Sequence, residues 1–251
     1  MSIKINPDVE IHEIFRHHYQ SQAYIDYRNM WYEYPKEFKV PEYPLAVDVE
    51  TCSGCNLNCK MCPRLYYGRD EKNELMPIEW FEKVFESNKI PACKTNWLNE
   101  PLQDKRLPSL IKFAKVHGVI DFRLNTNAVL LTEEISKALI QSGLDMIIFS
   151  VDSINPKIYE KIRVGAKFNK VINNIKRFIE IKGDRKPITR VSRVLLPEVQ
   201  NENFIEYFKN IGIDEVMTTK YVPPNRIAKN RRKSCDQPFQ RLIIDYKGFI
   251  H

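Results

Sequence analysis

The segment "LAVDVETCSGCNLNCKMC", residues 45–62, joins a strand-like run to four cysteines within eleven residues. The first seven residues, "LAVDVET", have the short apolar pattern of a buried β-strand. The cysteines begin where this predicted strand ends. The chain has 251 residues and six cysteines in all, so most of its cysteine is concentrated in this one loop.

Downstream of this segment, predicted strands and helices alternate. The strands are predicted at residues 45–51, 94–99, 119–126, 144–152, 188–197 and 214–222. The helices are predicted at residues 76–87, 106–118, 132–143, 155–163, 168–183 and 201–212. Such alternation predicts an α/β fold with parallel strands. Six units predict a partial (β/α)6 TIM-like barrel, because a full barrel needs eight, and the cysteines then lie at the reactive, carboxyl end of the first strand.

The rest of the chain divides around this barrel. We predict an N-terminal helical extension at 1–40, the barrel at 41–223 and a C-terminal segment at 224–251. The formal net charge is +7, but much of the basic excess falls in the run 225–234, which is typical of a solvated connection. Composition therefore does not favour nucleic acid as a partner. No apolar run is long enough for a signal peptide or a membrane span, and we expect a cytoplasmic protein.

Three kinds of metal site compete for the cysteines, since cytoplasmic cysteines are more often ligands than disulfides. Structural zinc takes four thiolates, but its cysteine pairs are usually separated by a longer loop than Asn56–Asn58. A ferredoxin cluster also takes four, but with its wider gap in another place. The third site uses only Cys55, Cys59 and Cys62 and leaves one iron of a four-iron cluster open for chemistry.

The C-x3-C-x2-C spacing of this third site resembles the cluster motif of the radical S-adenosylmethionine (radical SAM) superfamily. The resemblance implies a [4Fe–4S] cluster on Cys55, Cys59 and Cys62, with S-adenosylmethionine on the open iron. It implies that reductive cleavage then yields a 5′-deoxyadenosyl radical. The apolar residue before the third cysteine lies near adenine in this family, and Met61 holds that position. Cys52 would be a bystander at the strand end or a neighbour of the site.

Further motifs follow in the family's order and imply the remaining cofactor contacts. "NEPL" resembles a G-E-P-L motif that holds the methionyl amino group, with Asn99 in place of glycine. "TNAVLL" resembles a T-N-G segment, with Ala128 in place of glycine. "FSVDS", "YEKIRVG" and "VSRVLL" resemble segments around the methionyl carboxylate. The candidate cofactor-binding residues are Met61, Glu100, Asn127, Ser150, Asp152, Arg163 and Arg193, with Ser192 as the alternative to Arg193.

The C-terminal segment resembles the start of a SPASM region, the part of a radical SAM subfamily that holds auxiliary clusters. Cys235 and Gly248 match it, and the later cysteines of such a region are missing. We expect a longer protein cut within this segment, and an auxiliary [4Fe–4S] cluster through Cys235 only in that case.

Taken together, the sequence predicts an enzyme that abstracts hydrogen from a small-molecule substrate, a sugar or other metabolite, or from a peptide. The resemblance implies a reductase or flavodoxin-type protein as the electron donor. The alternative is a non-catalytic iron–sulfur or zinc-binding scaffold on the same barrel. The missing auxiliary ligands and Asn99 favour that alternative, while the intact set of three cysteines and gripping residues favours the enzyme.

Overall fold

A single twisted sheet organises the chain. The computed structural model describes residues 9–11, 21–66, 72–87, 89–199, 202–221 and 235–251. Within them the strand order is β1-β7-β6-β5-β4-β3-β2-β8. The strands are β1 (Val9–Ile11), β2 (Ala46–Val49), β3 (Ala92–Lys94), β4 (Asp121–Thr126), β5 (Met146–Ser150), β6 (Ile188–Leu195), β7 (Glu215–Lys220) and β8 (Arg241–Ile244). All neighbours pair in parallel except β1 with β7, which confirms the predicted α/β fold.

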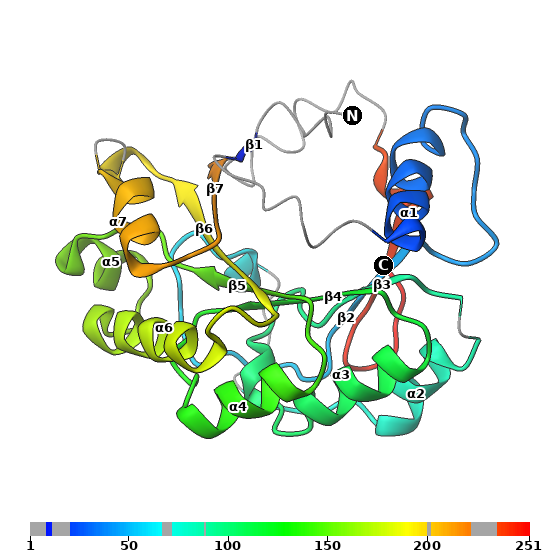
Figure 1. Cartoon of the computed structure of the whole chain (residues 1–251), viewed down its shortest axis with the longest axis horizontal. Helices are drawn as coiled ribbons and strands as arrows, with labels where there is room; N and C mark the ends of the chain where they lie inside the picture. The colour runs from blue at the N-terminus through cyan, green and yellow to red at the C-terminus, as the bar shows by residue number, and fades with distance from the viewer. Residues whose placement is uncertain (1–8, 12–20, 67–71, 88, 200–201, 222–234) are drawn as a thin grey trace.

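Helices cover one face of this sheet. They are α2 (Ile78–Phe85), α3 (Leu107–Val116), α4 (Glu133–Gln141), α5 (Pro156–Ile162), α6 (Phe168–Lys182) and α7 (Phe204–Ile211), and α1 (Gln22–Glu33) lies on the other face (Figure 1). Thr132 caps α4 as predicted, because its side chain accepts a hydrogen bond from the Ile135 backbone N–H. None of the helices within these residues combines the length and apolarity needed to cross a bilayer.

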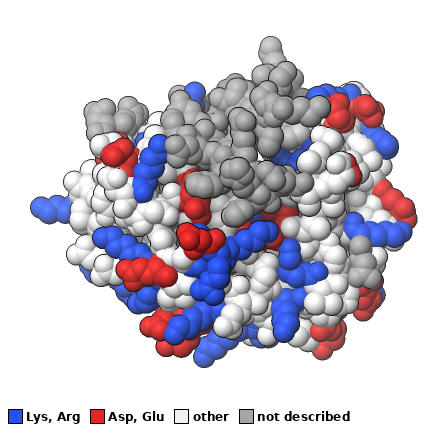
Figure 2. Space-filling view, viewed as in Figure 1, with Lys and Arg blue, Asp and Glu red and all other residues white. Residues whose placement is uncertain are grey.

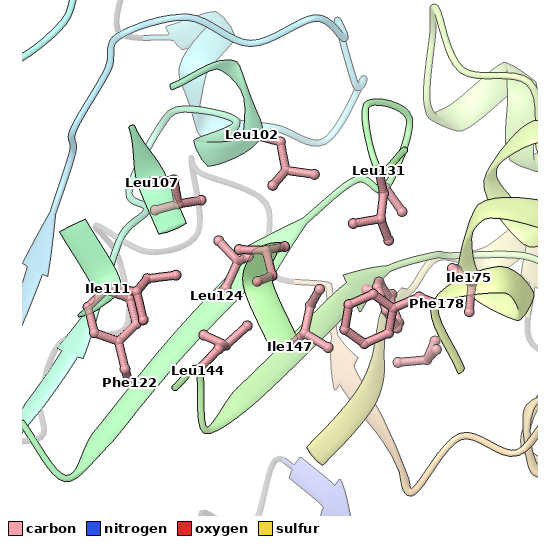
Figure 3. Close-up of a cluster of buried hydrophobic side chains, with 14 of the residues drawn as sticks. Leu102, Leu107, Ile111, Phe122, Leu124, Leu131, Leu144, Ile147, Ile175 and Phe178 are labelled. Carbon is pink, nitrogen blue, oxygen red and sulfur yellow. The ribbon is translucent and has the colours of Figure 1, made fainter. Parts of the chain in front are cut away.

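The main core lies between the sheet and the outer helices. Side chains alternate along a strand, so Phe122 and Leu124 of β4 point to the helices while Arg123 points the other way. Figure 3 shows Leu124 near Ile147 of β5, Ile147 near Phe178 of α6, and Phe122 toward the other end of the same cluster. All four are fully buried, at 0% exposure. Because side chains alternate, the residues between these buried ones point to the inner face of the barrel.

Helix α1 closes the inner face of the sheet at the amino ends of the strands. Tyr24 and Tyr27 of this helix form a separate apolar cluster with Leu45, Ala46 and Ala92. The Arg123 guanidinium, on the inner face of β4, donates a hydrogen bond of 3.3 Å to the Tyr24 hydroxyl. Apolar packing by α1 at the amino ends of the strands leaves the polar part of the inner face toward their carboxyl ends.

Three features differ from the sequence predictions. The predicted strand at 94–99 lies at Ala92–Lys94, since the Asn99 side chain bonds Trp97 N–H and the Thr95 carbonyl and so forms a turn. The predicted helical extension contains α1 but also the strand β1. The C-terminal segment is not separate, because β8 pairs with β2 in the main sheet.

The basic run 225–234 lies outside the described residues, and acidic and basic side chains intermingle on the face seen in Figure 2.

Candidate functional site

Three cysteines share the loop that follows β2. The Cys59 side chain is buried at 8% exposure, Cys55 and Cys62 are half-buried, and all three are free thiols. Burial raises the pKa of Cys55 to about 12, and the charges of Cys59 and Cys62 add to this rise. The neighbouring thiols thus disfavour ionisation of Cys55. Bound iron would offset this, since thiolates are its ligands.

The loop is fixed in place by the turn after α5. The Asn58 N–H donates to the Val164 carbonyl at 3.0 Å, and the Lys60 N–H donates to the Ile162 carbonyl at 3.1 Å. Gly165 completes this contact with a φ of +100°, and a Cβ there would lie 3.2 Å from Cδ2 of Leu57. A glycine is therefore required both by the backbone conformation and by the close approach of the cysteine loop.

We expect Gly165→Ala to destabilise the protein and to lower its iron content after reconstitution. The matched control is Gly183→Ala, since Gly183 also has a positive φ, +56°, but has open space around it. Overpacking should make Gly165→Ala less stable than this control by about 1–3 kcal/mol. Urea denaturation and iron assay of both variants measure this, and equal stability with equal iron would show that the contact with Leu57 is unimportant.

Cys52 is separate from the three other cysteines of the segment. Its side chain is fully buried, and its Sγ donates to the Glu100 carbonyl at 3.6 Å. The Asn99 amide in turn donates to this sulfur at 3.5 Å. Burial raises the pKa of Cys52 to about 11. These contacts tie the Cys52 sulfur to the turn that follows β3.

The Glu100 carboxylate connects the ends of β3 and β4. Its Oε1 accepts from Thr126 Oγ1 at 2.6 Å and from the Leu102 N–H at 3.2 Å, and its Oε2 accepts from the Asn127 N–H at 2.8 Å. Burial raises the pKa of Glu100, and these hydrogen bonds oppose that rise. A carboxylate has about four acceptor sites, so one remains for a ligand.

Asn127 extends this group to the cysteine loop. Its Nδ2 donates to Oδ1 of Asn56 at 2.9 Å, and its Oδ1 accepts from the Val129 N–H at 3.0 Å. The next residue, Ala128, is fully buried and has a φ of +59°, in the left-handed region where the family motif has glycine. The turn is thus kept despite the alanine.

Asp152 and Arg163 form a buried ion pair beside Cys59. Arg163 Nε donates to Asp152 Oδ2 at 2.7 Å, and its Nη1 lies 3.9 Å from Cys59 Sγ. Asp152 is fully buried, and its other oxygen accepts from the Val194 N–H at 2.9 Å. Burial lowers the pKa of Arg163, but Asp152 and Cys59 more than offset this and raise it above its usual value. The guanidinium is therefore a fixed cation next to the cysteines.

The remaining candidates differ in the face of the sheet to which their side chains point. Ser150 and Ser192 are register partners across β5 and β6. Both lie on the inner face, because Phe149 packs on Phe178 of α6 at the outer face. Arg193 is on that outer face, where its guanidinium stacks 4.3 Å from the Phe204 ring of α7. The structure thus places Ser150 on the inner face of the sheet and Arg193 on the outer face.

Met61 and two residues that were not predicted complete the surroundings. Met61 is half-buried and packs against the core beside the cysteines. Asn56 binds Asn127 from within the cysteine loop, and its place between Cys55 and Cys59 is the signal that could have revealed it. Tyr159 of α5 is fully buried, and its hydroxyl has no hydrogen-bond partner among the described residues. The "YEKIRVG" motif contained that signal, because it includes both Tyr159 and Arg163.

These residues fit an iron–sulfur cluster. In the described part of the chain, no three His, Cys, Asp or Glu side chains converge tightly enough to hold one metal ion. Three free thiols in one loop, Cys55, Cys59 and Cys62, are the kind of donor set that binds an iron–sulfur cluster. The Arg163 guanidinium lies 3.9 Å from Cys59 Sγ, and Tyr159, with its unpartnered hydroxyl, is one helical turn before Arg163. Both are donors suited to a negatively charged group.

Fold and site together define a partial-barrel protein with a loop of three free cysteines at the strand ends. Comparison with known proteins gives the family: residues 49–211 match the radical SAM superfamily, and the chain belongs to it.

Curated relatives and a solved structure agree with this family. The chain is 28% identical over 185 residues to a tungsten-containing aldehyde ferredoxin oxidoreductase cofactor-modifying protein of Pyrococcus furiosus, covering 70% of this chain and 51% of that protein. It is 33% identical over 130 residues to a probable GTP 3′,8-cyclase of Methanococcus maripaludis, covering 51% of this chain and 43% of that protein. The chain thus spans about half the length of these relatives.

The solved structure shows the fold. SuiB of Streptococcus suis, determined with S-adenosylmethionine bound, superposes with a TM-score of 0.64 at 13% identity, covering 90% of this chain and 64% of SuiB. At this identity the likeness extends to the arrangement of strands and helices and no further.

Proposed function

We propose that this protein is a radical SAM enzyme that cleaves S-adenosylmethionine reductively and abstracts hydrogen from a small polar molecule. The observation that carries the proposal is the convergence of three sets of residues at the carboxyl ends of β2 to β6. These are the three cysteines, the Glu100–Asn127 pair and the Asp152–Arg163 pair. When bound, a [4Fe–4S] cluster supplies the electron that breaks the sulfonium bond of S-adenosylmethionine.

Each pair has capacity for one end of the methionyl group. Glu100 accepts three hydrogen bonds and can accept another from an ammonium group. Arg163 has five N–H donors, of which Nε is used by Asp152, and the remaining fork suits a carboxylate. Both oxygens of Asp152 accept hydrogen bonds, one from the Val194 N–H and one from Arg163 Nε. The role of Asp152 is therefore to hold the Arg163 guanidinium in place. Ser150 adds a hydroxyl on the inner face, and Met61 an apolar contact for adenine.

The polar inner wall supports a small polar substrate rather than an extended apolar one. Asp48 Oδ2 accepts from Lys94 Nζ at 3.1 Å and from Arg241 Nη1 at 3.0 Å, so one carboxylate faces two cations there. Arg190 pairs with Glu215 further along the wall. Relatives named as GTP cyclases and cofactor-modifying proteins also favour a metabolite over a peptide. A flavodoxin-type protein or a reductase would supply the electron for the cluster. An auxiliary [4Fe–4S] cluster that uses Cys235 of the SPASM-like segment stays a prediction.

The test is anaerobic reconstitution with iron and sulfide, followed by reduction with dithionite in the presence of S-adenosylmethionine. We expect about four irons per chain, the content of one cubane cluster, and formation of 5′-deoxyadenosine. Mass spectrometry measures the nucleoside and a colorimetric assay the iron. Tight zinc binding without 5′-deoxyadenosine would instead establish the non-catalytic scaffold.

A further inference from the structure

Tyr159 is a buried residue that the proposed function does not use. It lies on α5 four residues before Arg163, so the two side chains share one face of the helix. Its side chain is fully buried, and its ring packs edge-on against Phe168 with centroids 5.5 Å apart. The core thus holds the ring in one orientation, and this packing does not involve the hydroxyl group.

That hydroxyl is unpartnered within the described residues. Buried polar groups in native proteins almost always have a partner, and leaving one unpaired costs free energy. Replacing tyrosine by phenylalanine would remove the cost without changing the ring, so an unpaired hydroxyl here indicates a partner that the described residues do not supply.

Contacts at the end of α5 place Tyr159 near the cysteine loop, because the Arg163 N–H donates to the Tyr159 carbonyl at 2.8 Å and Arg163 Nη1 lies 3.9 Å from Cys59 Sγ. Burial raises the pKa of Tyr159, Arg163 opposes this, and Asp152 and Cys59 raise it further. These three residues are the ion pair and the cysteine of the candidate site. The loop that carries Cys59 is joined to the end of α5 by the Lys60–Ile162 hydrogen bond of 3.1 Å. Tyr159 therefore lies behind the cluster-binding loop rather than at a remote part of the core.

We propose that the Tyr159 hydroxyl donates a hydrogen bond to a sulfur on the Cys59 side of the bound [4Fe–4S] cluster and thereby raises its reduction potential. This inference rests on the proposed function. Tyr159 would act as a tuning residue that does not touch the substrate. Its O–H would supply the donor, and Arg163, 3.9 Å from Cys59 Sγ, would supply a neighbouring positive charge.

The direction of the effect follows from charge. One electron from the external reductant makes the cluster one unit more negative, and no proton is transferred. A hydrogen bond to sulfur stabilises the more negative state more than the oxidised one. Removal of the donor should therefore make reduction harder. We expect about a tenfold shift in the reduction equilibrium, which is 59 mV for a one-electron couple.

The experiment compares reconstituted wild type, Tyr159→Phe and Tyr207→Phe by redox titration followed by electron paramagnetic resonance. Tyr207, on α7, is half-exposed and packs on Phe208, so it controls for loss of a tyrosine hydroxyl outside the site. The midpoint potential should fall in Tyr159→Phe alone. Electron–nuclear double resonance in H2O and D2O should show an exchangeable proton near the cluster that Tyr159→Phe lacks.

Iron content separates this inference from the proposed function. Wild type without about four irons would overturn the proposed function itself. If wild type and Tyr159→Phe both hold that iron, an unchanged potential and an unchanged exchangeable proton would overturn the role of Tyr159 alone. Thermal unfolding of the iron-free proteins completes the test. Tyr159→Phe should be at least as stable as wild type there, and a loss of stability would show that the hydroxyl serves the fold.

Discussion

Cys59→Ala is expected to abolish both iron binding and 5′-deoxyadenosine formation. Cys59 is the most buried of the three cysteines that share the loop, and it is the one beside Arg163. Loss of an outer hydrogen-bond partner of a metal ligand typically costs about 10–100-fold in affinity. Loss of a ligand itself should cost at least about 100-fold. Iron assay after anaerobic reconstitution, with nucleoside detection by mass spectrometry, measures both effects.

Cys52→Ala is the matched control, because Cys52 lies in the same segment and is even more buried. Its sulfur is occupied by the Glu100 carbonyl and the Asn99 amide, so its loss should weaken the turn but leave about four irons per chain. Cys55→Ala and Cys62→Ala should behave like Cys59→Ala. Equal iron loss in Cys52→Ala would instead mean that all four cysteines are ligands, and that no iron is left open for S-adenosylmethionine.

Arg163→Met is expected to reduce the free energy of unfolding by about 3–5 kcal/mol. The substitution leaves the Asp152 carboxylate, which is fully buried, with only the Val194 N–H as a partner. An uncompensated buried charge is among the most costly defects a fold can carry. Urea denaturation of the iron-free protein measures this loss without interference from cofactors. The same variant should lose affinity for S-adenosylmethionine in its reconstituted form.

A double-mutant cycle separates charge from packing. Asp152→Asn combined with Arg163→Met removes both charges and should recover about 1–3 kcal/mol of the loss. Lys137→Met breaks an exposed pair with Glu133 on α4 and should leave stability nearly unchanged. If the double variant were no more stable than Arg163→Met, the cost would come from lost packing, and Asp152 would not be the residue that holds Arg163.

Much of this fold could be predicted from local patterns in the sequence. Alternating strands and helices gave the parallel sheet, and cysteine spacing identified the loop that carries Cys55, Cys59 and Cys62. Glu100 and Asn127 lie 27 positions apart, and their hydrogen bond was foreseeable only through a family motif. That these residues bind S-adenosylmethionine is still a prediction.

Other features depend on information that no short window contains. Arg193 and Ser192 are adjacent in sequence, and only the packing of Phe149 on Phe178 decides which of the two faces inward. The turn at Asn99 ends β3 early because the Asn99 side chain, and not a neighbouring strand, accepts the hydrogen bond of the Trp97 N–H. Strand propensity does not predict such a side-chain hydrogen bond. The partnership of β8 with β2 depends on contacts between distant parts of the chain.

That partnership sets an order of events during synthesis. Ala46 of β2 pairs with Arg241 of β8, which follows it by 195 positions in the sequence (241 minus 46). At about 5–20 residues per second, a ribosome needs about 10–40 s to cover that distance. For this interval the edge of β2, from which the cysteine loop emerges, has no strand beside it on one side. That side of β2 is therefore completed late, and we expect iron to be delivered after β8 has been synthesised.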